Sequence, residues 1–303
     1  MRANLCFQPT ASLACARLRR LKHIPLGRLN SCMQIIDLTT HYIQYVIYQN
    51  RLDFYEASFP QLFEHYYRFW ASRSPYFYRE ENEIQHRRKL ISERLAFLED
   101  RFLSRGLVLD QVVIVLFVGQ GTSNGHAFPI DEKWIVWLPV ESYPSPFTID
   151  VFASHEIAHA LHYQKQPEFF FNTEEEKTNV FRQVVTEGIA TITSKNVLDI
   201  DDEQALWADY LPKEQIRQWY AECVSREAEI LGIVAEKLES SDGSLFSYTG
   251  SEDVIENRAG YYAALKIIQR ILYENKLSLI ELYTIEKQAL FRMIQVLLKN
   301  QPT

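Results

Sequence analysis

The order of apolar and polar residues along the chain predicts a mainly helical protein with one short β region. Residues 33–107 are predicted to be helical, because aromatic and aliphatic side chains recur near the 3.6-residue period of an α-helix. The second helix there, roughly Arg79–Ser104, is expected to end at Gly106. The first carries an aromatic stripe that we assign to the hydrophobic core. The stripe comprises Phe54, Phe59, Leu62, Phe63, Tyr66, Tyr67 and Trp70.

Strands are expected in one region only. Residues Val112–Val118 form a short apolar run rich in β-branched residues, and residues 126–128 and 133–140 supply further strands. The loop between the first two, 119–125, is rich in glycine but lacks the Lys-Ser/Thr ending and the following helix of a phosphate-binding loop. The predicted fold class is therefore α+β: mainly helical, with a small antiparallel or mixed sheet.

The second half of the chain is predicted to be helical. Thr148 is the candidate N-cap of a helix that Pro167 ends. Further helices are expected around Val184–Thr191, within residues 201–239 on either side of Pro212, near 257–274 and near 277–299.

The first of these helices contains His155-Glu156-Ile157-Ala158-His159, an H-E-x-x-H pattern. Residues four apart lie on one face of a helix, about 6 Å apart, so both imidazoles can reach one ion. Zn²⁺ accepts histidine nitrogens, and Glu156 is placed to take a proton from a water molecule on the metal. The alternative is a surface helix with two solvated histidines, which the small and apolar neighbours disfavour.

A third ligand must come from another part of the chain. Glu187, on the second helix, is the favoured candidate because a His₂Glu site leaves one position for water. Gly188 beside it suits a close approach of two helices. The acids at 174–176 are rivals, although three adjacent acids also suit a helix N-terminus. His162 lies about 10 Å along the axis from His155, so it is expected to line the groove or support the ligands.

These residues resemble a known group of enzymes. H-E-x-x-H followed by Thr186-Glu187-Gly188-Ile189-Ala190 looks like the gluzincin zinc metallopeptidases. It is most similar to a bacterial family of predicted zinc-dependent proteases, which also carry a Gly-Tyr segment, here Gly260-Tyr261. The resemblance covers roughly residues 110–275. It implies a zincin-like fold, a Zn²⁺ cofactor and a small sheet before the metal helix. Unlike better-known gluzincins, this chain has Thr191, not an acid, one turn after Glu187.

Two further roles are expected in such a site. A donor must stabilise the oxyanion that forms at the attacked carbonyl. Tyr261, Tyr262 and Arg258 are available, and Tyr261 is favoured as a catalytic residue beside Glu156. By the same resemblance, an edge strand runs along the cleft, where it can bind an extended peptide as an added strand.

The candidate strand for substrate binding is Gly125-His126-Ala127, although His126 equally suits a plain surface position. The predicted function is a zinc-dependent peptidase that hydrolyses peptide or protein substrates through a metal-activated water. The alternatives are a non-hydrolytic zinc-binding regulator or scaffold with a zincin-like fold, and a helical interaction protein without a metal.

Charge separates the first 32 residues from the rest. Residues 1–32 contain six Arg or Lys and no acid, which leaves 26 basic and 39 acidic side chains in residues 33–303. This basic leader is expected to be disordered or a spurious extension before Met33, or else an organellar transit peptide. Three of the four cysteines lie in it, so Cys223 alone remains, which fits a reducing cytoplasm.

The remaining chain is expected to comprise an N-terminal helical region (33–110), a zincin-like catalytic core (111–195) and a C-terminal helical region that completes the cleft (196–303). Its acidity argues against nucleic acid as a partner, because phosphate binding requires a basic face. The longest apolar run has seven residues, Val112–Val118, far short of the ~20 that span a bilayer. The sequence leaves the oligomeric state open.

Overall fold

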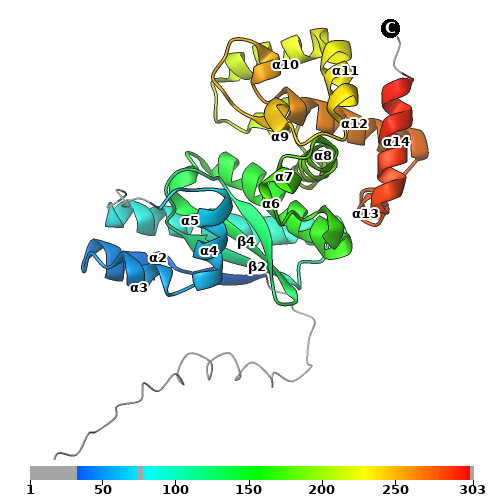
Figure 1. The fold of residues 1–303 in the computed structure, drawn as a ribbon. Coiled ribbons are helices and arrows are strands. Elements are labelled where there is room, and N and C mark those ends of the chain that lie inside the picture. Colours follow the sequence, from blue (N-terminus) through cyan, green and yellow to red (C-terminus); the bar gives the residue numbers. More distant parts are fainter. Residues whose placement is uncertain (1–32, 74–77, 79, 301–303) are drawn as a thin grey trace, which may run out of the picture. The chain divides into compact units, whose positions relative to one another are not determined.

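The computed structural model describes residues 33–73, 78 and 80–300. The expectation for the basic leader at 1–32 lies outside the described residues. Figure 1 shows the fold, with strands and helices labelled in chain order. No helix among the described residues combines the length and the apolar character that a transmembrane span requires.

A mixed four-stranded sheet forms the β part of the fold, in the order β1-β2-β4-β3. The strands are β1 (Gln34–Asp37), β2 (Val112–Phe117), β3 (His126–Ile130) and β4 (Lys133–Pro139). Strands β1 and β4 flank β2 in parallel, and β3 pairs antiparallel with β4, with His126 opposite Trp137. Every residue of β2 is buried, as expected for a central strand with both faces covered. The α+β class is confirmed.

Strand β1 was not predicted, because residues 33–107 were expected to be helical throughout. It has four residues, polar at both ends, and its pairing partners Val113–Leu116 lie far along the chain. A strand this short is defined by its tertiary pairing and not by its own sequence pattern.

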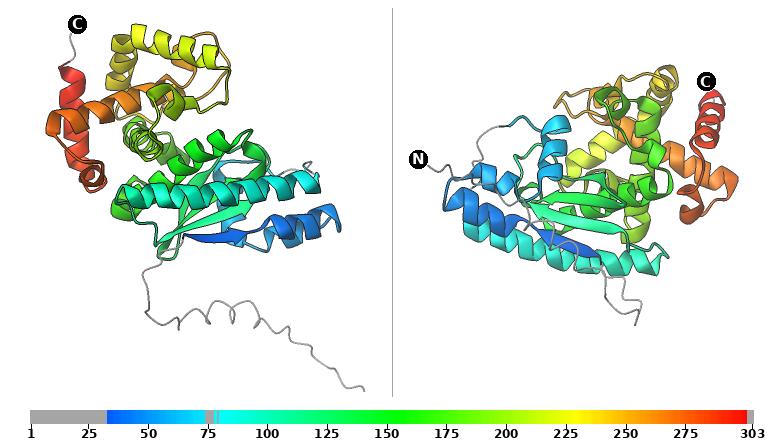
Figure 2. Two further views of the ribbon diagram at one scale, coloured as in Figure 1. Left: turned by 180° about the vertical axis from the view of Figure 1, so that it is seen from behind. Right: turned by 60° about the horizontal axis from the view of Figure 1, so that its bottom comes forward.

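Helices cover both faces of the sheet. The N-terminal helices are α2 (Thr39–Tyr42), α3 (Leu52–Glu56), α4 (Pro60–Phe69) and α5 (Glu81–Ser104). Tyr66 of α4 contacts Trp137 edge-on, whereas Tyr163 of α6 (Pro146–Lys165) contacts Trp134, with ring centroids 5.7 and 5.2 Å apart. Side chains three residues apart in β4 point to opposite faces, so α4 and α6 lie on opposite sides of the sheet. Seen from behind, α5 runs across the sheet (Figure 2).

The predicted aromatic stripe runs from α3 to the end of α4. Its members Leu62, Phe63 and Tyr66 are buried. Phe59, Tyr67 and Trp70 are partly buried against the core, and Phe54 is exposed. Helix α5 ends as expected before Gly106, which adopts the left-handed φ of +75°.

Helix α6 is buried on all sides, from Thr148 to Tyr163. The prediction that Thr148 caps it was wrong: the N-cap is Ser145, whose side chain accepts a hydrogen bond from the Thr148 backbone N–H at 3.0 Å. Pro146 then occupies the first helical position, where its missing N–H costs nothing. The helix ends at Lys165, before Pro167, as predicted.

Helix α8 (Val180–Leu198) packs between α6 and α12 (Ala259–Asn275), as Figure 1 shows. Asn179 caps it by accepting from the Arg182 backbone N–H at 2.9 Å. A Cβ at Gly188 would lie 2.5 Å from Ile268 Cγ1 and 2.6 Å from the Ala264 carbonyl oxygen of α12. The predicted close approach of two helices at Gly188 is therefore confirmed.

The remaining helices are α7 (Glu174–Lys177), α9 (Asp202–Trp207), α10 (Lys213–Ser225), α11 (Glu227–Lys237), α13 (Leu279–Leu282) and α14 (Lys287–Lys299). Two predicted helices are divided further than expected. The 201–239 stretch breaks at Arg226 as well as Pro212, and the Arg226 guanidinium binds Glu229 and Asp253. The expected helix at 277–299 splits in two: a capping box of Ser278 and Glu281 begins α13, which ends after one turn, and α14 begins at Lys287.

We expect Gly188→Ala to lower the free energy of unfolding by about 1–3 kcal/mol, because the added methyl group overpacks the α8–α12 contact. Gly232→Ala in α11 is the matched control, since a Cβ there meets nothing within 4 Å. The control should be neutral or stabilising by up to about 1 kcal/mol. Urea unfolding of both variants measures the difference, and equal effects would contradict the close packing at Gly188.

Candidate metal centre

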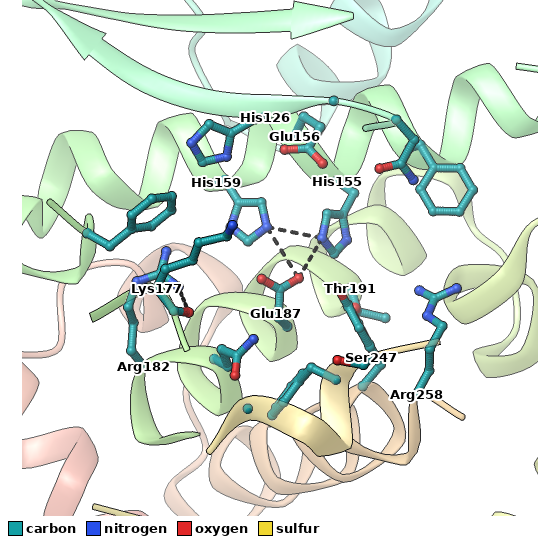
Figure 3. A pocket seen from close by; sticks show the side chains of 18 of the residues that line it. His126, His155, Glu156, His159, Lys177, Arg182, Glu187, Thr191, Ser247 and Arg258 are labelled. Atoms are coloured by element: carbon teal, nitrogen blue, oxygen red, sulfur yellow. Dashed lines mark hydrogen bonds and ion pairs between the residues drawn. The ribbon is translucent and has the colours of Figure 1, made fainter. Parts of the chain in front are cut away.

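Two histidines of α6 and one glutamate of α8 meet at the centre of a cavity (Figure 3). His155 Nε2 lies 3.0 Å from Glu187 Oε2 and 3.1 Å from His159 Nε2, and His159 Nε2 lies 3.5 Å from the same carboxylate oxygen. The spacing of four residues puts both imidazoles on one face of α6. The three side chains predicted from the sequence therefore converge.

Hydrogen bonds alone do not satisfy these three contacts. A neutral imidazole Nε2 carries either one proton or one lone pair. If His155 Nε2–H donates to the ionised Glu187, it has no lone pair to accept from His159 and no second proton to donate to it. One cation between the three atoms satisfies all of them at once.

The distances also suit a particular cation. Tetrahedral Zn²⁺ with ligands at about 2.0–2.1 Å separates neighbouring ligand atoms by about 3.3 Å. The observed separations of 3.0, 3.1 and 3.5 Å lie around that value. Among the described residues, His155, His159 and Glu187 are the one group of three or more possible metal ligands whose atoms lie this close together. Their donor set of two imidazoles and one carboxylate fits zinc.

The charges of these side chains are strongly coupled. Burial raises the pKa of Glu187, but His159 and His155 outweigh that effect and hold it well below its ordinary value. Burial lowers the pKa of His155, whereas at His159 the Glu187 and Glu156 carboxylates overcome burial and raise the pKa. Glu187 is thus ionised, the state that binds a metal.

Glu156, the residue after His155, also lines this cavity. The backbone of Gly125, the residue before β3, passes directly over the Glu156 side chain. A Cβ at Gly125 would lie 2.5 Å from Glu156 Cγ, and Gly125 has a φ of +153°. Both the contact and the backbone conformation require glycine. Burial raises the pKa of Glu156 to about 7.

Comparison with known proteins agrees with this geometry. The model of the family described as Predicted Zn-dependent protease (DUF2268) matches residues 107–292. The chain belongs to this family. No curated protein and no solved structure matches it.

The matched range contains every residue that lines the cavity except Trp70, the C-cap of α4, which precedes residue 107. The resemblance predicted from the sequence, over roughly 110–275, is confirmed. The description names zinc dependence, and the ligand geometry of this family member suits that ion.

Strand β3 lies at the edge of the sheet, where it pairs with β4 alone. Gly125 and His126 line the cavity, but Ala127 is fully buried and does not. His126 is not a surface residue. Its ring stacks on His65 with centroids 5.3 Å apart, and its Nε2 is buried without a hydrogen-bond partner among the described residues. Burial lowers the pKa of His126 well below its ordinary value, so the imidazole is neutral.

The opposite wall comes from the N-cap and first turn of α12. Tyr261 and Arg258 line the cavity, and the Arg258 guanidinium lies 4.4 Å from the centroid of the Tyr261 ring. Tyr262 points elsewhere, since its hydroxyl donates to Glu227. Thr191, one turn after Glu187, also lines the cavity.

One expectation for a nearby residue differs from the structure, and one choice between alternatives is resolved. His162 does not line the groove: it is fully buried against Phe169, with ring centroids 4.8 Å apart, and burial lowers its pKa to about 3. The acids at 174–176 form the first turn of the short helix α7, as the helix N-terminus interpretation predicted, and they take no part in the ligand group.

Several residues that line the cavity were not found from the sequence, and three of them carry a charge or contact a candidate ligand. These three are Tyr163, Lys177 and Arg182. Tyr163 stacks on His159, with centroids 5.7 Å apart, and its hydroxyl accepts from Arg182 at 2.8 Å. The one available signal was that Tyr163 follows His159 by four residues, and so lies on the ligand face of α6.

The raised pKa of Glu156 predicts a pH-dependent cost to the metal-free protein. Its ordinary pKa is 4.5, and its value in the folded protein is about 7. The unfolded chain therefore loses this proton first, so folding stability falls as the pH rises from about 4.5 to 7. Glu156→Gln abolishes this loss. In chelator-treated protein it should be more stable than the wild type at pH 8.5, by about 1–3 kcal/mol, and nearly equal at pH 4.5.

Glu187→Gln provides a control of opposite sign, because the pKa of Glu187 is lowered in the folded protein. This variant should be less stable than the wild type near neutral pH. Chemical denaturation at both pH values measures all three proteins. A Glu156→Gln difference that stays constant with pH would contradict the burial of an ionisable Glu156.

Proposed function

We propose that this protein is a zinc peptidase in which His155, His159 and Glu187 hold the metal. The observation that carries the proposal is the convergence of their three ligand atoms at 3.0–3.5 Å beside a second, buried carboxylate. A zinc ion held there supplies a Lewis acid that polarises the peptide carbonyl and lowers the pKa of a water toward ~7.

Glu156 is the proposed general base. It does not belong to the ligand group, and its carboxylate enters the same cavity. A base works best when its pKa lies near the working pH, and that of Glu156 is about 7. It takes the proton of the attacking water and then delivers it to the leaving amine.

Tyr261 is the proposed oxyanion donor. Its hydroxyl remains protonated, because burial raises the pKa of Tyr261 above its ordinary value. Its ring is held between Phe246, with centroids 5.4 Å apart, and the Arg258 guanidinium. A donor fixed before the reaction does not need to reorganise as charge develops on the carbonyl oxygen.

The edge strand β3 is the proposed substrate platform. Gly125 and His126 reach the cavity at the sheet edge that pairs with no other described strand. A peptide added to this edge would run past Glu156, because the Gly125 backbone already lies against that side chain. The substrate is thus an extended peptide segment.

A zinc-binding regulator without hydrolytic activity is the competing function. It would require the His₂Glu site but no buried base. Burying Glu156 carries the cost in stability described above, and such a cost is typical of residues retained for function. The peptidase is therefore favoured.

Glu156→Gln should retain about one zinc per chain while peptide hydrolysis falls by about 10²–10⁴-fold, the usual contribution of a general base. His155→Ala should lose both zinc and hydrolysis. Elemental analysis, with digestion of a broad peptide library, measures the two quantities.

Glu175→Gln, at an exposed position on α7, is the matched control and should leave both unchanged. Full hydrolysis by Glu156→Gln would contradict the base assignment. Zinc binding by the wild type without cleavage of any library peptide would favour the regulator.

A further inference from the structure

The cavity is rich in positive charge although the protein is acidic. Lys177, Arg182 and Arg258 line it, together with the carboxylates Glu156 and Glu187. A bound divalent cation balances the two carboxylates, which leaves three positive side chains in a protein of net charge −7. Lys177 and Arg182 lie on one side of Glu187 and Arg258 on the other (Figure 3).

Two of these cations already have acceptors. Arg182 donates to the Phe169 and Lys177 carbonyl oxygens and to the Tyr163 hydroxyl, at 2.8, 3.4 and 2.8 Å. Lys177 donates to the Phe69 carbonyl oxygen at 2.5 Å and lies 3.4 Å from Glu174. Both side chains thereby tie the segment 169–177 to the cavity wall.

Arg258 has no such acceptor. Within the described part of the chain, its guanidinium makes no hydrogen bond or ion pair; it packs 4.4 Å from the Trp207 ring centroid and 4.4 Å from that of Tyr261. Two aromatic rings thus fix the guanidinium while its five N–H donors stay uncommitted. A planar guanidinium held in this way is suited to bind a carboxylate through two parallel hydrogen bonds.

The backbone at Arg258 is also unusual. It adopts the left-handed conformation, with φ +62° and ψ +20°, which is strained for a residue with a side chain. The Arg258 N–H donates to the Ser247 carbonyl oxygen at 2.9 Å, and Trp219 Nε1 donates to the preceding Asn257 carbonyl oxygen at 2.7 Å. Glycine would fit this backbone better, so the arginine side chain must offset the strain.

Arg258 lies close to the ligand group as well as to the aromatic rings. Burial lowers the pKa of Arg258, and the nearby Tyr261 and Glu187 offset only part of that effect. Burial also lowers the pKa of His155, and the charge of Arg258 acts in the same direction. A group bound to Arg258 would therefore sit in the same cavity, of about 360 Å³, as the attacked peptide bond.

We propose that Arg258, clamped between Trp207 and Tyr261, binds a carboxylate of the substrate and makes this enzyme selective for anionic peptides. This inference rests on the peptidase function proposed above. The carboxylate comes either from an acidic side chain near the cleaved bond or from the free C-terminus of the peptide. Both sources present the same planar acceptor, and the experiment below distinguishes them.

The test measures binding and cleavage separately. Four hexapeptide pools contain either Glu or Gln at a fixed position and end in either a free acid or an amide. Calorimetry measures their binding to the zinc-loaded full chain carrying Glu156→Gln, which prevents turnover. Pools with the recognised carboxylate should bind about 10–100-fold more tightly than their uncharged partners. The Glu/Gln pair and the acid/amide pair show which source is recognised.

In the Arg258→Gln and Arg258→Gly backgrounds this preference should fall to about 1-fold. Arg258→Gly removes the side chain and relieves the left-handed backbone, so it guards against loss of folding. Lys177→Gln is the matched control, because it removes one positive charge from the same cavity but leaves Arg258 in place. It should keep most of the preference.

Equal binding of all four pools, or an equal loss of preference in Lys177→Gln, would overturn the proposal. Cleavage by the wild-type protein is scored independently on the same pools. If carboxylate-selective binding depends on Arg258 but no pool is cleaved, the subsite stands and the peptidase function fails. If pools are cleaved without any carboxylate preference, the peptidase function stands and the subsite fails.

Discussion

The site depends on how closely helix α8 approaches its two neighbours. At Gly188 no Cβ separates α8 from α12, and the backbone oxygen of Ala264 occupies the space that a side chain would need. Glu187, the preceding residue, is thereby directed at the imidazoles of α6, with its carboxylate 3.0 Å from His155 Nε2. A shift of α8 by even a methyl radius would separate a ligand set whose atoms must lie about 3.3 Å apart to share one zinc ion.

This packing places ionisable groups where an uncompensated charge is costly. Helix α6 is buried along sixteen consecutive residues, 148–163, and it carries both proposed histidine ligands and Glu156. Apolar positions of the same helix anchor it in the core, so the imidazoles cannot turn toward solvent. A divalent cation bound there would compensate the charge of Glu187 and replace the competing hydrogen bonds of the histidines. The same burial keeps the pKa of Glu156 near 7, so the environment that suits a metal also suits a base.

The candidate metal centre could be predicted from the sequence because short local motifs contain the residues that form it. H-E-x-x-H places both imidazoles by helix geometry alone, and Glu187 was identified from a second helix with a glycine beside the acid. The other parts depend on contacts between distant residues. Strand β1, for example, exists through its pairing with β2. The N-cap is the exception: Pro146 directly follows Ser145, so the true helix start was signalled locally and the prediction of Thr148 overlooked it. His162 and His126 read as polar positions, but helix and strand packing buries both. The sequence indicates Arg258 only as a possible oxyanion donor. Nothing in its neighbouring residues predicts that its guanidinium packs between the rings of Trp207 and Tyr261.

A crystal structure of the zinc-loaded protein, with anomalous diffraction recorded at the zinc edge, tests the central claim most directly. The account predicts a single strong anomalous peak bonded to His155 Nε2, His159 Nε2 and a Glu187 carboxylate oxygen at about 2.0–2.2 Å, with Glu156 adjacent but unbonded. A peak at other residues, or no peak while the three side chains remain hydrogen-bonded to one another, would contradict it.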